Sequence, residues 1–283
     1  MNKSDSTVSV VETFILGKNH DQTLCEDALF IGSDYIAVVD GATNGDAVLP
    51  DGRVPGKIAA DVLIDAFNHL KGDSDARSAM RFLDGTIRDW YRREGIESVA
   101  RTNPERRVSA SSVIYSIARR EIWLLGDCQA RIGDIEVTNH KETDVLMEEV
   151  RAFVIESERA SGKTVTELLD DDTGRTVIRP LIVRQRSFQN TDTGTVYDYN
   201  VLDGFLPDDA YIKVESVPPG PVSVVLGSDG YPRLLPTLKE TEAHLAELLA
   251  EEPLLYSRFK STKGVYPGNH SFDDRAYIRI MVT

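Results

Sequence analysis

Apolar positions along the chain follow two different periods. Runs rich in Val and Ile at 8–16 and 28–39 are typical of β-strands, and a Gly-Ser-Asp break divides the second run into strand, turn and strand. From Pro55 to Leu70 and from about 75 to 93, apolar residues instead recur at helical spacing. The first third of the chain therefore predicts strands followed by two amphipathic helices that lie on a sheet.

The remainder of the chain mixes the same two periods. Polar breaks separate the next three strand-like runs, which predicts a local meander of antiparallel strands. The predicted elements are strands at 109–118, 121–127 and 130–138, a helix at about 142–160, a short helical stretch at 164–169, strands with Gly and Asn turns over 176–217, a strand at 221–229, a helix at 237–251 and a closing strand at 271–283.

Strands and helices come in blocks and do not alternate one by one. This order argues against a parallel α/β sheet and predicts an α+β layered fold, in which sheets pack on each other with helices outside. No internal repeat and no low-complexity linker interrupts the pattern. We therefore expect one domain over 1–283 with a variable middle.

Composition and charge narrow the classes of function. Of the 283 residues, 41% are hydrophobic and 28% charged, as in ordinary globular proteins. Lys and Arg number 32 against 46 Asp and Glu, and the resulting net charge of −14 repels nucleic acid and anionic lipid. No apolar run has the length of a membrane helix, and the first residues lack the pattern of a signal peptide. Two cysteines, Cys25 and Cys128, fit a reducing compartment, so we expect a cytoplasmic protein.

Carboxylates mark the ends of the predicted strands. If these strand ends meet, several anions share a small volume. An unpaired buried carboxylate is costly, so such a cluster requires cations, and hard divalent ions with oxygen ligands suit it. The acids concerned are Glu26, Asp27, Asp40, Asp127, Asp229, Asp273 and Asp274.

Two other interpretations of these acids are weaker. Asp-Gly and Ser-Asp-Gly are common turn sequences, but turn chemistry gives no reason for an apolar strand followed by an acid to recur. The stretch 40–51 is spaced roughly like the calcium-binding loop of an EF-hand. Its third position, however, is Ala42, its last is Asp51 in place of Glu, and a strand precedes it in place of a helix.

Taken in order, the motifs resemble those of the metal-dependent Ser/Thr protein phosphatases, the PPM or type 2C family. That family has an acidic pair, a strand ending in Asp-Gly, a Gly-Asp-Ser turn, a Ser-Asp-Gly turn and a final Asp-Asn before the last strand. Here they read "CEDALF", "IAVVDGATN", "IWLLGDCQARI", "VVLGSDGYPRLL" and "FDDRAYIRI", in the same order across nearly the whole chain. The resemblance implies a four-layer α-β-β-α sandwich with two central antiparallel sheets.

The resemblance also implies a catalytic centre. Asp40 would bridge two Mn²⁺ or Mg²⁺ ions, and the Gly41 carbonyl would ligate one of them. Asp229 and Asp273 would hold the other ion. A hydroxide between the two ions would then attack the phosphate of phosphoserine or phosphothreonine in a protein substrate, the product of a partner kinase.

Further acids take supporting roles in the resemblance. Glu26 and Asp27 would act through metal-bound water, and Asp127 matches an acid that supports a third, weaker ion. Asp274 stands where the family usually has Asn, and we expect it in the same metal site.

The chain departs from the family at several positions. Ala42 stands where many members have a His that is a candidate general acid. Gln22 stands where many members have a phosphate-binding Arg, and Lys18 and His20 lie nearby in the sequence. The segment 140–215 matches poorly and corresponds to a flap that varies between members and influences substrate choice.

These departures keep two alternatives open. The chain could be a pseudophosphatase that binds a phosphorylated partner without turnover, which the missing His and Arg favour and the retained Asp40, Asp229 and Asp273 oppose. It could also hydrolyse a small phosphorylated metabolite, which the sequence does not separate from a phosphoprotein.

Overall fold

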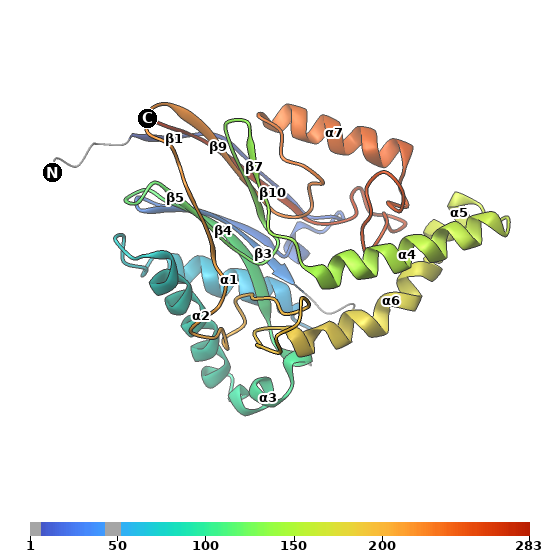
Figure 1. The fold of residues 1–283 in the computed structure, drawn as a ribbon, viewed down its shortest axis with the longest axis horizontal. Helices are drawn as coiled ribbons and strands as arrows, with labels where there is room; N and C mark the ends of the chain where they lie inside the picture. Colours follow the sequence, from blue (N-terminus) through green and yellow to red (C-terminus); the bar gives the residue numbers. More distant parts are fainter. Residues whose placement is uncertain (1–6, 43–51) are drawn as a thin grey trace.

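Two five-stranded antiparallel sheets form the centre of the molecule (Figure 1). The structure is a computed structural model that describes residues 7–42 and 52–283. One sheet has the order β1-β10-β9-β6-β7 and the other the order β2-β3-β4-β5-β8. The strands are β1 Val8–Leu16, β2 Asp27–Ile31, β3 Tyr35–Ala42, β4 Ser109–Ser116, β5 Glu121–Leu125, β6 Gln129–Ile132, β7 Ile135–Val137, β8 Lys213–Ser216, β9 Val222–Gly227 and β10 Arg275–Val282.

Helices cover the outer faces of both sheets. The helices α1 (Pro55–Phe67) and α2 (Ala76–Arg93) pack on the sheet that contains β3 and β4, and α7 (Leu238–Glu251) packs on the sheet that contains β9 and β10 (Figure 1). A third core lies between the sheets and is built from Val, Ile and Leu of both. These layers confirm the predicted α+β sandwich with the order α-β-β-α.

Several predicted helices begin where the sequence signals indicate. Pro55 occupies the first turn of α1, where its missing N–H costs nothing. Asp75 caps α2, since its carboxylate accepts a hydrogen bond from the Ser78 N–H at 2.7 Å. The helices α4 (Glu142–Ala160) and α5 (Val165–Asp170) also lie within one residue of their predicted bounds, whereas α3 (Glu97–Thr102) had no prediction. Among the described residues, no helix combines the length and apolar character needed to cross a membrane.

The prediction of a single meander over 109–138 was wrong. Strands β4 and β5 pair in one sheet, while β6 and β7 belong to the other. The chain crosses between the sheets at Gly126, which has φ 82° and packs so closely on Ser111 that a Cβ would lie 2.0 Å from the Ser111 Oγ. A polar break thus marks a change of sheet, which local hydropathy does not distinguish from a hairpin.

The prediction of strands over 176–217 was also wrong for most of that segment. Residues Thr173–Arg184 form helix α6, and only β8 is a strand. The β-branched residues suggested a strand, but Ile178 and Ile182 lie one helical turn apart and are buried against Met147 of α4. Tertiary packing outweighs the local preference, and α4, α5 and α6 together form the arm on the right of Figure 1.

Candidate metal centre and cleft

Strand ends from both sheets meet at one cleft. Asp27 of β2 is paired with Asp40 of β3 across one sheet, and Asp229 follows β9 of the other sheet. Asp40, Asp127 and Asp229 each offer a carboxylate oxygen, and these three oxygens lie within 4.8 Å of one another. Residues about 90 and 190 positions apart in the chain are thereby placed at one point, as expected if several strands deliver an acid to the same cation.

Close packing requires a glycine directly after Asp40. The Gly41 N–H donates to the Glu26 carbonyl at 3.1 Å, and a Cβ on Gly41 would lie 2.1 Å from the Gly56 carbonyl oxygen. Only glycine allows the first turn of α1 and the segment before β2 to approach this strand so closely. The Asp-Gly motif thus places the start of α1 beside the acids.

The cleft has an acidic floor and a wall with many basic residues. Its volume is about 570 Å³. The floor contains Glu26, Asp40, Asp127, Asp229 and Asp273, and Asp144 and Glu148 of α4 also line the cleft. The basic residues of the lining are Lys18, Lys141, Arg175, Arg179, Arg186, Lys260 and Lys263. Among the described residues, the lining thus has as many Lys and Arg residues as acids, whereas acids outnumber Lys and Arg by 46 to 32 in the whole sequence.

Three carboxyls in or beside the cleft floor are destabilised as anions. Burial and the nearby charge of Asp229 raise the pKa of Asp40 well above its usual value. Burial and the charges of Asp127 and Asp273 raise the pKa of Asp229 to about 7. The pKa of Asp27 is also raised by burial and by Asp274, although the Ser228 hydroxyl donates to its carboxylate at 2.6 Å.

Asp273 is instead stabilised as an anion. Burial alone would raise its pKa, but the ammonium groups of Lys263 and Lys18 bring that pKa well below the usual range. The Nζ of Lys18 lies 3.1 Å from the Asp273 carboxylate, and Lys263 forms a second ion pair with it. The acid that the resemblance places on a metal therefore has two lysine partners here.

Asp127 has a similar lysine partner. The Nζ of Lys141 lies 2.5 Å from one Asp127 oxygen, and the Ser111 hydroxyl donates to the other oxygen at 2.5 Å. Burial would raise the pKa of Asp127, but these two contacts lower it. Lys141 also pairs with Asp144 at 3.0 Å, which joins the start of α4 to the cleft floor.

Asp274 ties the closing strand to the start of the chain. Its two carboxylate oxygens accept hydrogen bonds from the backbone N–H groups of Lys18 at 2.7 Å and Glu26 at 3.0 Å. The Nζ of Lys18 lies 3.3 Å from Asp274 and 3.4 Å from Glu26. These contacts fix the acidic pair before β2 beside the segment before β10.

The donor set fits a hard divalent cation. Three carboxylate oxygens converge from separate strands, and oxygen ligands are those that Mg²⁺ and Mn²⁺ prefer. The raised pKa values of Asp40 and Asp229 show that this group of acids lacks sufficient positive charge of its own. A bound cation would supply that charge.

The departures from the family pattern can be located in the structure. Gln22 is not among the residues that line the cleft, and its side-chain oxygen accepts the Gly17 N–H at 2.9 Å. His20 contacts the ring of His270, and Ala42 lies at the end of β3 in the cleft lining. Most of the loop that was compared with an EF-hand, from 43 to 51, lies outside the described residues.

Sequence reasoning missed the basic side of the cleft. Lys141, Lys263 and Arg186 contact the cleft or its acids but carry no motif of their own. A lone Lys or Arg in a helix or loop is most often a solvated residue. Only the folded arrangement distinguishes these from the other basic residues of the chain.

Solved structures of PPM-type Ser/Thr phosphatases are similar to this chain over nearly its whole length. The catalytic domain of the phosphatase PstP in complex with two manganese ions is 15% identical, with 98% of this chain and 97% of that chain covered and a TM-score of 0.47. PppA, a regulatory component of the T6SS in Pseudomonas aeruginosa, is 12% identical, with 98% and 99% covered and a TM-score of 0.47. MsPP, a PPM Ser-Thr phosphatase from Mycobacterium smegmatis in complex with cacodylate, is 12% identical, with 99% of each chain covered and a TM-score of 0.43.

No protein-family model matches the sequence. No curated protein matches it either. Identities and TM-scores of this size do not by themselves assign a family.

Proposed function

We propose that the chain is a metal-dependent phosphatase of the PPM type that hydrolyses phosphoserine or phosphothreonine in proteins. One observation carries the proposal. Asp40, Asp127 and Asp229, from three separate strand ends in two sheets, converge in a cleft large enough for a phosphorylated side chain. The motif order of the sequence and the layered fold support the same assignment.

The acids of the cleft floor and the basic residues of its wall have different roles in this proposal. Asp40, Asp127 and Asp229 would hold a divalent cation, and the metal roles of Glu26, Asp27, Gly41, Asp273 and Asp274 stay predictions. When bound, Mn²⁺ or Mg²⁺ neutralises phosphate charge and makes hydroxide available near neutral pH. The lysines and arginines of the wall offset the field of the floor, so that a phosphate monoester can enter.

The two cysteines do not serve as nucleophiles in this proposal. Both are buried, with exposed fractions of 3% for Cys25 and 0% for Cys128. Burial and neighbouring carboxylates raise the pKa of Cys25 to about 12 and that of Cys128 well above its usual value. Both thiols stay protonated at neutral pH, which supports direct hydrolysis without a phosphocysteine.

The test is manganese-dependent release of phosphate from an aryl phosphate and from a phosphothreonine peptide. Asp40→Ala and Asp229→Ala should abolish both reactions, while Asp134→Asn, a change at a fully exposed acid, should leave them intact. A folded protein that binds manganese and turns over no phosphoester would overturn the proposal. Turnover of nucleotides or sugar phosphates without turnover of the phosphopeptide would indicate a metabolite phosphatase in place of a protein phosphatase.

A second candidate is a phosphoprotein-binding module without turnover. The observation in its favour is that Lys18, Lys141 and Lys263 already pair with Glu26, Asp127 and Asp273. Ammonium groups could satisfy these acids in place of metal. Tight binding of a phosphopeptide, unchanged by a chelator and without release of phosphate, would favour this candidate.

A further inference from the structure

One arginine in the cleft wall comes from the segment that matched the family least. Arg186 follows α6 in a short 3-10 turn, Gln185–Phe188, and its exposed fraction is only 6%. Its Nη1 donates to the Ser109 hydroxyl at 2.7 Å and to the Gln189 side-chain oxygen at 2.5 Å. All three residues line the cleft.

Strand register places this guanidinium near the acidic floor. Ser109 of β4 is directly opposite Ala42 of β3, and Ser111 is directly opposite Asp40. Residues two apart in a strand share a face, and opposite residues have their Cβ atoms roughly 5 Å apart. Arg186 therefore sits on the Asp40 face of this strand pair, beside Ala42.

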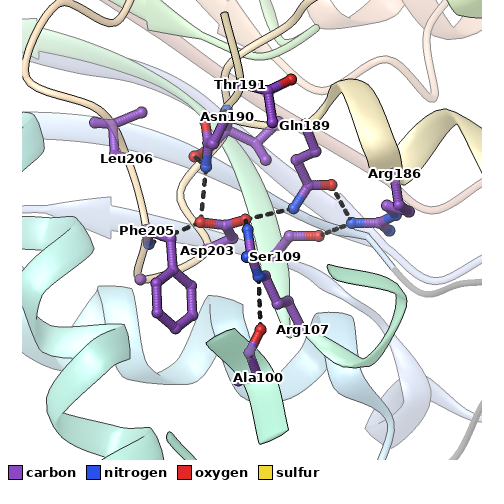
Figure 2. Close-up of polar contacts among 12 residues, drawn as sticks. Ala100, Arg107, Ser109, Arg186, Gln189, Asn190, Thr191, Asp203, Phe205 and Leu206 are labelled. Atoms are coloured by element: carbon purple, nitrogen blue, oxygen red, sulfur yellow. Dashed lines mark hydrogen bonds and ion pairs between the residues drawn. The ribbon is translucent and has the colours of Figure 1, made fainter. Parts of the chain in front are cut away.

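A buried network holds Arg186 in this position (Figure 2). The Gln189 amide donates to the Asp203 carboxylate at 2.6 Å, so the amide oxygen is turned toward Arg186. Asp203 has an exposed fraction of 0% and also pairs with Arg107 at 3.0 Å. Arg107 in turn donates to the Ala100 carbonyl at 2.9 Å, which anchors the network to α3.

We propose that Arg186 binds the phosphoryl oxygens of the substrate. The inference rests on the proposed function and names a residue that performs the role for which the resemblance expected an arginine at Gln22. Gln22 is committed to the backbone of Gly17, so the phosphate-binding cation comes from the 185–206 segment instead of the loop before β2. Gln189 is a positioning residue, because it orients the guanidinium from behind.

The chemistry of the arginine suits the role. A guanidinium presents a rigid fork of N–H donors that matches two phosphate oxygens, and its charge does not titrate near neutral pH. Because Ser109 and Gln189 both accept from Nη1 and hold the side chain in place, little side-chain entropy is lost when an anion binds to the guanidinium. The place beside Ala42 thus holds a permanent cation, which stabilises phosphate charge but donates no proton to the leaving group.

Equilibrium binding of inorganic phosphate to the manganese-loaded protein tests the inference directly. Arg186→Met should weaken phosphate binding roughly 10- to 100-fold, the loss expected for charge-assisted hydrogen bonds. Arg186→Lys should fall in between, since it keeps the charge and loses the fork. Arg184→Met, at an exposed arginine of α6 outside the cleft lining, is the matched control and should bind like the parent.

The positioning role needs a separate readout. Gln189→Met removes the oxygen that orients Arg186, so we expect weaker phosphate binding and a raised KM with a smaller change in kcat. Thermal unfolding of each variant is measured in parallel. Unchanged phosphate affinity in a Gln189→Met protein of lowered Tm would reduce Gln189 to a structural role.

The outcomes separate this inference from the proposed function. Parent-like phosphate affinity and KM in a folded Arg186→Met protein would overturn the role of Arg186, while manganese-dependent turnover would still stand. A parent protein without turnover, but with phosphate binding that Arg186→Met abolishes, would overturn the enzyme and keep the anion site.

Discussion

Two groups of buried carboxylates in this molecule have opposite environments. Beneath the 203–206 segment, Asp84 accepts the backbone N–H groups of Asp203, Gly204 and Leu206 at 2.7–3.0 Å, and Asp203 pairs with Arg107. In the cleft floor, Asp40, Asp127 and Asp229 crowd together instead. Burial and Asp203 raise the pKa of Asp84 as well, but its oxygens accept backbone N–H groups, whereas Asp40 and Asp229 have raised pKa values and line a cleft that a ligand can enter.

The largest expected effect is on catalysis at the floor. Asp40→Asn removes a negative charge that would hold the metal ion. We expect the variant to lose several kcal/mol of transition-state stabilisation, which slows phosphate release by at least about 10³-fold. The same change relieves repulsion, so the metal-free variant should unfold at higher urea than the metal-free parent. Assays of phosphate release with manganese measure the first effect. Urea unfolding followed by circular dichroism measures the second. Reduced stability would place Asp40 among the structural acids.

The next effect is on folding at the other group. Asp203→Ala leaves the nearly buried Arg107 without its carboxylate and should lower the free energy of unfolding by about 3–5 kcal/mol. Asp203→Asn keeps part of the hydrogen bonding and should cost less. Urea unfolding of both variants checks this, and a cost below that of ordinary surface substitutions would contradict a structural role for Asp203.

The pH dependence of metal-free stability separates the groups further. The pKa of Asp229 is raised to about 7, so the folded protein holds a proton that the unfolded chain releases near pH 4. The free energy of unfolding therefore falls as pH rises through this window, and the metal-free protein should be more stable at pH 5 than at pH 8.

One variant and one manganese addition test which carboxyls cause this slope. Asp229→Asn should reduce it, and the slope that persists should include Glu148, whose pKa is raised to about 7 by burial and by Asp144, and Asp84, whose pKa is raised to about 6 by burial and by Asp203. Added manganese should stabilise the parent more at pH 8 than at pH 5, because protons compete for the same oxygens. An identical manganese effect at both pH values would contradict the location of the cation at these acids.

The smallest effect concerns the lysine at the edge of the floor. Lys141→Met removes an ammonium that competes for Asp127, so manganese affinity should rise on the order of tenfold, equal to about 1.4 kcal/mol. Lys57→Met, which removes an ion pair with Asp61 on α1, is the control. Calorimetric titration gives both affinities and the number of ions. An unchanged affinity and ion count would show that Lys141 does not occupy a cation position.

Much of the fold was predictable where local pattern and tertiary environment agree. Strand β1 and helices α2, α4 and α7 have apolar residues of one clear period and lie at their predicted bounds within a residue. Helix α6 was missed because its Val and Ile residues favour a strand locally, and the crossover at Gly126 was missed because a change of sheet has no local signature.

For the site, the sequence by itself determined which acids stand at strand ends and in what order, because an apolar strand followed by Asp is a local pattern. The tertiary structure decided that carboxylate oxygens of Asp127, Asp40 and Asp229 lie within 4.8 Å of one another, whereas Asp273 pairs with Lys18 and Lys263. It also decided that Arg186 faces the cleft. The physical reason is that electrostatic partners are chosen by distance in space, and residues far apart in the chain, such as Lys18 and Asp273, are brought within a few ångströms only by the packing of the two sheets and the helical arm.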